Sequence, residues 1–200
     1  MVTAVMPVSH KDIDMLGISL ASIKSQVDRV VVVSDIPLNL DAEVLIQEKD
    51  GIGNARKQGI LYADDEYIIS ADADTYYPPG YVKEAVSALE KCEYARAAKI
   101  YPLSPSIGAK VEAVFYPTIN YEFALALRRS AFISHGLDKI DYKGRYDIGE
   151  FLWKIGVPCF FPSYVVTRLP TYAFKSLIDS ITVSIVGALG TIPIAVLLEK

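Results

Sequence analysis

The chain has 200 residues, of which 52% are apolar and 22% charged, and its formal net charge is -4 at pH 7. That length is sufficient for one compact domain without disulfide or metal cross-links, and the apolar content excludes a disordered chain. The negative charge, with no stripe of lysine and arginine to offset it, excludes nucleic acid as an expected partner.

Short apolar runs rich in Val and Ile alternate with helical patterns in the first half of the chain. Strands are expected at Val2–Val8, Arg29–Ser34, Val44–Gln47, Tyr67–Ala71 and Ala95–Tyr101. Helices are expected between them at Asp14–Ser25, Gly53–Tyr62 and Tyr81–Lys91. This alternation is typical of parallel strands joined by crossover helices. We therefore predict an α/β fold with a mostly parallel, twisted sheet flanked by helices on both faces.

The pattern is less regular in the second half of the chain. Proline and glycine residues between 102 and 108 predict a loop, and residues 123–127 predict a further strand. A helix is expected from Arg145 to Ile155, and one or two short strands are expected between Pro158 and Leu169.

The C-terminal segment differs in composition, because the nineteen residues from Ser180 to Leu198 carry no charge. That is close to the ~20 residues that cross a bilayer. Residues 174–185, however, place apolar and polar side chains on opposite faces of a helix. Three interpretations stay open, namely a helix packed on the sheet, a helix lying in a membrane interface, and a membrane span.

The organisation expected from these patterns is one domain with an apolar tail. Its parts are a domain of residues 1–172, with a nucleotide-binding half of about 1–100 and an acceptor half of about 101–172, and a tail of residues 173–200. Cys92 and Cys159 have no metal-type spacing, and we expect two reduced, buried thiols. The first strand has no basic region or cleavage site before it, so no signal peptide is expected. We expect the protein in the cytoplasm, either free or as a peripheral protein at the cytoplasmic face of a membrane.

An acidic triplet, Asp72-Ala73-Asp74, follows the fourth expected strand. Parallel sheets bind ligands at the carboxyl ends of their strands, and two carboxylates in a turn there can approach one hard cation. Mg²⁺ or Mn²⁺ at such a place neutralises a diphosphate leaving group as its bond breaks. The alternative is that both residues only end the strand and cap the next turn.

Upstream of the triplet, Gly51 and Gly53 precede a predicted helix that carries Arg56 in its first turn. Glycines permit close approach of the backbone, and a helix N-terminus with a guanidinium nearby favours an anion. The sequence therefore indicates a contact of Gly53 and Arg56 with a phosphorylated ligand. The alternative is a tight turn without a ligand.

As a set, four segments resemble the family 2 glycosyltransferases of GT-A type. They are Val5–Val8, residues 19–35, Gly51–Ile60 and Glu66–Pro79. The resemblance implies a GT-A fold and the metal-dependent transfer of a sugar, with inversion, from a nucleoside-diphosphate sugar to an acceptor hydroxyl. Arg56 stands where the family commonly has a basic residue near the donor.

For the donor, the resemblance implies a backbone lip under the nucleotide at Pro7 and Val8. It also implies a contact of Asp35 with the base or the ribose. Asp72 is expected to reach the ribose and the metal, and Asp74 is expected to bind the metal directly.

A second stretch, Arg128–Gly156, extends the resemblance to the acceptor side. Its first part resembles the family's segment that ends in Gly-Gly-Phe-Asp, with His135 in place of the first glycine. Its later part resembles the Glu-Asp pair at a helix start that supplies the catalytic base. Tyr146 replaces the usual Glu, so Asp147 is the candidate base.

The chemistry of that assignment follows from physical reasoning as well. An inverting transfer needs a carboxylate that takes the proton of the acceptor hydroxyl, and a carboxylate at a helix N-terminus stays ionised. The alternative for Asp147 is an ordinary N-cap. His10 is expected to be a surface residue, and no Ser/His/Asp arrangement supports hydrolytic chemistry.

Two other functions compete with sugar transfer. A sugar nucleotidyltransferase usually has a glycine-rich loop after its first strand, and Pro7–Lys11 contains no glycine. A non-catalytic, membrane-associated protein that keeps the fold is the other alternative. The sugar, the nucleotide and the acceptor, whether glycan, lipid or protein, are not indicated by the sequence.

Overall fold

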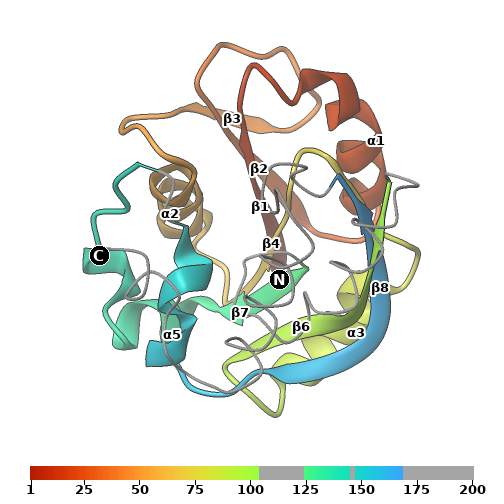
Figure 1. Ribbon diagram of the computed structural model, residues 1–200, viewed down its shortest axis with the longest axis vertical. Helices are drawn as coiled ribbons and strands as arrows, with labels where there is room; N and C mark the ends of the chain where they lie inside the picture. Colours follow the sequence, from red (N-terminus) through yellow and green to blue (C-terminus); the bar gives the residue numbers. More distant parts are fainter. Residues whose placement is uncertain (104–123, 145–146, 169–200) are drawn as a thin grey trace, which may run out of the picture.

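The computed structural model describes residues 1–103, 124–144 and 147–168 of the chain (Figure 1). The strands are β1 (Val2–Val8), β2 (Arg29–Ser34), β3 (Glu43–Ile46), β4 (Tyr67–Ser70), β5 (Thr75–Tyr76), β6 (Tyr94–Pro102), β7 (Leu125–Arg128) and β8 (Cys159–Thr167). The helices are α1 (Ile13–Lys24), α2 (Ile52–Ala63), α3 (Tyr81–Leu89) and α5 (Arg129–Ser134), with 3₁₀-helices η2 (Leu137–Lys139) and η3 (Ile148–Lys154). In these three ranges, no helix combines the length and the apolar character that a membrane crossing requires.

The strands form one 8-stranded sheet in the order β3-β2-β1-β4-β7-β6-β8-β5. β1 pairs in parallel with β2 and β4, and β2 pairs in parallel with β3. β7 runs antiparallel between β4 and β6, β8 is parallel to β6, and β5 is antiparallel to β8. The predicted α/β class is confirmed, with a parallel first half and a mixed second half. The carboxyl ends of β1, β2 and β4 therefore meet at one edge of the sheet.

Helices cover the sheet on both faces (Figure 1). Ala4 and Met6 of β1 pack in one core cluster with residues of α1 and α3, among them Leu20. Val5, which lies between them in the strand, packs in a second cluster with Ile60 of α2. Successive side chains of a strand point to opposite faces, so β1 is buried on both of them. This double burial explains why its sequence is an almost continuous apolar run.

Helix α2 lies unusually close to the sheet because of Gly59. A Cβ atom at this position would collide with Val5 of β1 and would come within 3.1 Å of Val33 Cγ2 in β2. Arg56 lies about one turn before Gly59 in α2, and its side chain bonds to Ser70 and to the Ala71 carbonyl at the carboxyl end of β4.

The predicted elements agree with the structure most closely in the first half. β1 and β2 have the predicted bounds, and the other predicted strands and helices up to residue 102 are within two residues of the observed ones. The helix predicted at Arg145–Ile155 is a 3₁₀-helix that begins at Ile148, and the region 158–169 contains the single strand β8. β5 and α5 were not predicted. Most of the predicted loop at 102–108 and the whole tail 173–200 lie outside the described residues.

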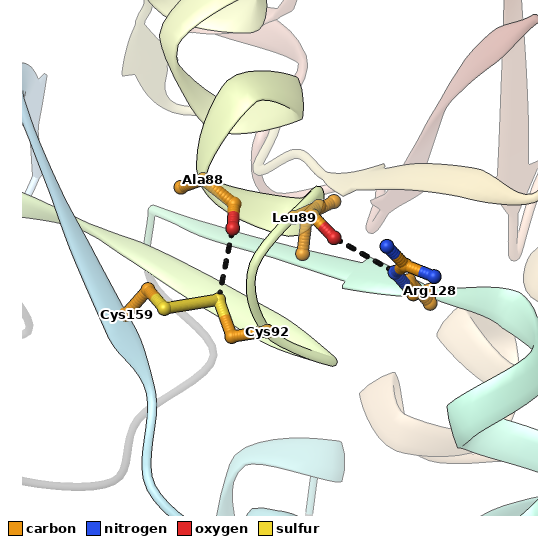
Figure 2. Close-up of a disulfide and its surroundings, with 5 residues drawn as sticks. All are labelled: Ala88, Leu89, Cys92, Arg128 and Cys159. Atoms are coloured by element: carbon orange, nitrogen blue, oxygen red, sulfur yellow. Dashed lines mark hydrogen bonds between the residues drawn. A yellow bond between two sulfur atoms is a disulfide. The ribbon is translucent and has the colours of Figure 1, made fainter.

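Cys92 and Cys159 form a disulfide (Figure 2), which corrects the expectation of two reduced, buried thiols. Both residues are half-buried. Cys159 begins β8 and pairs with Ala95 of β6, while Cys92 lies in the turn just before β6. The two Cα atoms are therefore 6.2 Å apart, a separation that a disulfide spans. Their distance in sequence concealed this contact, because only the parallel pairing of β6 with β8 brings them together.

Candidate active site

The acidic triplet, residues 72–74, follows β4 at the edge where the parallel strands end. Its turn is fixed by Ser19 of α1. The Ser19 hydroxyl donates to the Ala73 carbonyl at 2.7 Å and accepts from the Thr75 N–H at 2.9 Å. One buried side chain thus bonds to the backbone on both sides of Asp74. The turn is held in place before any ligand binds.

Asp72 is 8% exposed and has one satisfied and one unsatisfied carboxylate oxygen. Its Oδ1 accepts from Arg56 Nη2 at 2.8 Å, and its backbone N–H donates to the Tyr77 hydroxyl at 2.8 Å. Its Oδ2 is buried and has no hydrogen-bond partner among the described residues. Burial raises the pKa of Asp72, and the charge of Arg56 opposes that shift. A buried carboxylate oxygen without a partner favours a positively charged ligand.

Asp74 is half-buried beside Asp72. Burial first, and then the negative charge of Asp72, raise the pKa of Asp74 to about 7. No group of three His, Cys, Asp or Glu side chains that would hold a metal occurs in the described ranges. Two carboxylates are nevertheless the number that Mg²⁺ uses when substrate phosphates and water complete its coordination. Asp72 and Asp74 therefore fit a divalent cation that arrives with a phosphorylated ligand.

Arg56 is completely buried and links this turn to the second half of the chain. Its Nε lies 3.1 and 3.2 Å from the two carboxylate oxygens of Asp147. Its Nη1 donates to the Ser70 hydroxyl at 2.6 Å and to the Ala71 carbonyl at 3.1 Å. Its Nη2 contacts Asp72 Oδ1 at 2.8 Å and Asp147 Oδ2 at 3.1 Å. These contacts use all three nitrogens of the guanidinium.

Asp147 is the N-cap of η3 and is 1% exposed. Its Oδ1 accepts from the Ile148 N–H at 2.6 Å, and its own N–H donates to Glu150 Oε2 at 2.8 Å. The Asp147 side chain also accepts from the backbone N–H of Glu150, and the two reciprocal bonds between Asp147 and Glu150 form a capping box. The structure thus places Asp147 at a helix start, as predicted, and adds the pairing with Arg56. Its role as a base stays a prediction.

The glycine turn before α2 packs against the second half of the chain. Gly51 has a φ of 104°, which favours glycine, and a Cβ there would lie 2.9 Å from the Tyr142 carbonyl oxygen and 3.0 Å from that of Gly144. Gly53 is buried in the first turn of α2. The close backbone approach that the glycines permit is therefore an approach to residues 142–144. A contact of Gly53 with the donor stays a prediction.

Asp35 lies apart from this network, because β1 stands between β2 and β4. Its Oδ1 accepts from the His10 N–H at 2.9 Å, and its Oδ2 lies 2.8 Å from His10 Nδ1. The hydrogen bond from the His10 side chain holds the pKa of Asp35 below its usual value. Pro7 and Val8 are buried in β1, so a nucleotide would meet their backbone rather than their side chains.

Some residues that shape the site were not predicted to belong to it. Ser70 receives a hydrogen bond from Arg56, Tyr77 bonds to the Asp72 backbone, and Ser19 fixes the turn. Of these three residues, only Ser70 could have been assigned to the site from the sequence, because a polar residue that ends a buried strand needs a hydrogen-bond partner. His10 is exposed, as expected, but its pairing with Asp35 was not foreseen.

Comparison with known proteins identifies a matching family and similar solved structures. Residues 3–101 match the model of glycosyl transferase family 2. The structure of S. aureus TarS 1-349 in complex with UDP-GlcNAc is similar, with a TM-score of 0.63 and 15% identity over 95% of this chain and 67% of that one. Glucosyl-3-phosphoglycerate synthase from Mycobacterium tuberculosis, solved with Mn²⁺, UDP and glucosyl-3-phosphoglycerate, has a TM-score of 0.59 and 12% identity over 94% of this chain and 77% of that one.

Identities this low show the fold, which is GT-A, and not the substrates. The chain spans 66% of S. aureus TarS 1-349 and 40% of the longer TarS chain. No curated protein matches it in sequence.

Proposed function

Because the chain belongs to glycosyl transferase family 2 and has the GT-A fold, we propose that it transfers a sugar from a nucleoside-diphosphate sugar to an acceptor hydroxyl, with the help of a divalent metal ion. UDP-sugars are the first donors to test. TarS was solved with UDP-GlcNAc, and the mycobacterial synthase was solved with Mn²⁺ and UDP-glucose.

The observation that carries the proposal is the pair of carboxylates after β4, one of which has a buried, unsatisfied oxygen. Asp72 Oδ2 is buried without a hydrogen-bond partner in the described part of the chain, and burial, followed by the negative charge of Asp72, raises the pKa of Asp74 to about 7. Arg56 is the buried cation of this network, and it is shared with Asp147. The turn and its buried partners thus have three carboxylates and one guanidinium, and the nearby Asp12 and Arg168 add one charge of each sign. A divalent cation bound with the donor diphosphate would balance this charge.

In this proposal, Asp72 and Asp74 would hold the metal ion, whose positive charge would stabilise the negative charge that develops on the departing nucleoside diphosphate. Ser19 and Tyr77 keep the two carboxylates in place through their bonds to the backbone of the turn. A site that is held before the ligand arrives does not have to reorganise as the leaving group gains charge. Pro7 and Val8 would support the nucleotide through their backbone, and Asp35 would contact its base or ribose.

Asp147 is the proposed base, and inversion is proposed from the family likeness. The Asp147 carboxylate is used by the backbone N–H groups of Ile148 and Glu150 and by Arg56, whose Nε and Nη2 both contact Oδ2. A carboxylate oxygen can accept two hydrogen bonds, so an acceptor hydroxyl that approaches Asp147 would share Oδ2 with Arg56. Transfer of the proton to this oxygen would leave the acceptor oxygen free to attack the anomeric carbon.

The test is a panel of UDP-, GDP- and ADP-sugars, scored for thermal stabilisation and for release of the nucleoside diphosphate. We expect at least one sugar nucleotide to raise the melting temperature in the presence of Mn²⁺ or Mg²⁺ and not with EDTA. Asp74→Asn should abolish the metal-dependent part of both signals.

The matched control is Asp41→Asn, which removes a carboxylate whose side chain is 97% exposed and remote from the turn. This variant should behave as the wild type does. Donor binding that ignores the metal, or that survives Asp74→Asn unchanged, would contradict the proposal. Release of pyrophosphate from a nucleoside triphosphate and a sugar phosphate would instead identify a nucleotidyltransferase.

The tail, residues 173–200, lies outside the described residues, and its role is proposed from sequence alone. We propose that it attaches the protein to a cytoplasmic membrane surface, because the run from Ser180 to Leu198 has no charge. Flotation with liposomes of the full chain and of a chain ending at residue 172 tests this proposal. Equal flotation of the two would contradict it.

A further inference from the structure

The two carboxylates expected to act on opposite sides of the reaction bind the same guanidinium. Asp72 belongs to the turn after β4, and Asp147 begins η3 in the second half of the chain. Arg56 of α2 contacts both, at 2.8 Å for Asp72 Oδ1 and at 3.1 Å for Asp147 Oδ2. The contacts with Asp72 and Asp147 use the same nitrogen, Nη2. The positions of the two carboxylates are thus linked through one rigid, planar group.

The geometry leaves Arg56 little freedom to move or to serve a ligand directly. The side chain is completely buried, and its remaining donors are bound by Ser70 and by the Ala71 carbonyl at the end of β4. Nε is shared by both oxygens of Asp147, so the carboxylate is held by two nitrogens at once. Such a two-point contact fixes orientation as well as distance.

We propose that Arg56 is a positioning residue, which sets the orientation of Asp147 relative to the metal-binding turn and does not itself contact the donor. The inference rests on the proposed function, since it assigns to Asp147 a part in transfer. The residue acts through the carboxylates on its two sides. It differs in this respect from a basic residue that binds a phosphate of the donor.

Replacement of Arg56 by lysine tests the geometry of the side chain separately from its positive charge. Lysine keeps the positive charge and donates three hydrogen bonds from one atom, so it cannot reproduce the fork that spans Asp72 and Asp147. A misplacement of a reacting group by about 1 Å lowers the rate of reaction by about 100-fold. We therefore expect Arg56→Lys to lower kcat for UDP release from UDP-GlcNAc with Mn²⁺ by about 100-fold, with the KM for the donor changed by less than about threefold.

The matched control is Arg29→Lys. Arg29 forms a comparable fork with Glu43, at 2.9 Å for each of its two contacts, on the far side of the sheet from the acidic turn. Loss of that fork should leave kcat and KM unchanged. Circular dichroism and the melting temperature report whether each variant is folded.

Asp147→Asn and the double variant complete the test. If Arg56 acts through Asp147, the double variant should lose no more turnover than the more affected single variant, because interacting residues are not additive. If the two losses multiply, or if Arg56→Lys raises KM as strongly as it lowers kcat, Arg56 acts on the donor and the inference is overturned.

Failure of the proposed function gives a different result. If the wild type neither binds nor cleaves any sugar nucleotide tested, urea unfolding of the same variants tests whether Arg56 and Asp147 are energetically linked. An effect of Arg56→Lys on the unfolding midpoint that is smaller in the Asp147→Asn background than in the wild type supports the link, and the remainder reflects the contacts of Arg56 with Asp72 and Ser70. Equal effects of Arg56→Lys on the unfolding midpoint in both backgrounds overturn it.

Discussion

The side chain of Asn54 pairs with the backbone of Tyr142 in both directions. Its Nδ2 donates to the Tyr142 carbonyl at 2.9 Å, and its Oδ1 accepts from the Tyr142 N–H at 3.2 Å. A neighbouring strand would satisfy the backbone of Tyr142 in the same way, but here a helix side chain does so. The pair joins α2 to the segment after η2, and Arg56 of the same helix contacts Asp147 further along the chain.

Asn54→Ala should therefore destabilise the protein by about 2–4 kcal/mol, because it leaves a buried N–H and a buried carbonyl unpaired. Urea unfolding measures this change. Asn39→Ala, in an exposed loop position, is the control and should change the free energy of unfolding by less than about 0.5 kcal/mol. A loss at Asn54 as small as that at Asn39 would mean that the pair contributes little.

Metal binding should depend on pH through Asp74. Burial and the charge of Asp72 raise the pKa of Asp74 to about 7, so below that pH a metal ion must displace a proton. Titration calorimetry with Mn²⁺ and UDP should show an affinity that falls by about tenfold for each pH unit below about 7 and levels off above it. Asp74→Asn should lose metal binding at every pH tested, and a variant that binds Mn²⁺ with the pH profile of the wild type would contradict the assignment.

The same shift predicts how metal-free stability varies with pH. The pKa of Asp74 rises on folding from 3.8 to about 7, so between these values the folded protein holds a proton that the unfolded chain releases. Its contribution to stability is present below about pH 4 and is lost as the pH rises to about 7. Unfolding in EDTA across this window should show a decrease for the wild type and a shallower one for Asp74→Asn. Equal slopes would refute the shift.

Gly59→Ala should destabilise the protein although alanine favours helices. The added methyl group collides with Val5, a β-branched side chain that cannot easily turn aside, and presses on Val33. We expect a net loss of about 1–3 kcal/mol in urea unfolding. Gly17→Ala in α1 is the control, because nothing lies within 4 Å of its Cβ position, and it should gain up to about 1 kcal/mol. The same sign for both substitutions would contradict the close packing of α2.

Reduction of the Cys92–Cys159 disulfide should lower the free energy of unfolding. The bridge closes a loop of 67 residues, which in the chain-entropy description corresponds to about 4 kcal/mol. Urea unfolding with and without dithiothreitol measures the effect. The Cys92→Ser variant cannot form the bridge, so its free energy of unfolding should be the same with and without dithiothreitol. A wild type that is equally insensitive to the reductant would show that the bridge is absent or without effect.

The sequence predicted the first half of the fold because its elements carry local signals. β2, for example, is a run of four valines bounded by polar residues, and its predicted and observed bounds coincide. The second half has weaker signals, since β5 contains two residues and η3 is a 3₁₀-helix with a different period from an α-helix.

In the candidate site, too, only the features that depend on local sequence could be predicted. Asp72 and Asp74 could be placed at a sheet edge because they directly follow a strand. The contact between Arg56 and Asp147 could not be predicted, since it joins residues 91 positions apart and depends on the packing of α2 against η3. The same limitation concealed the partner of each cysteine.

The shared guanidinium also restricts the order in which these positions can change. Substitution of Arg56 first would leave Asp72 and Asp147 as two buried carboxylates facing each other without their common cation, which is strongly destabilising. Substitution of Asp147 by asparagine first would leave Arg56 paired with Asp72. The effects of substitutions at Arg56, Asp72 and Asp147 are thus expected to depend on one another. Replacement of Asp147 before Arg56 should be tolerated, whereas replacement of Arg56 before Asp147 should not. An engineer who wishes to alter the acceptor side of this protein would begin at Asp147 and leave Arg56 until last.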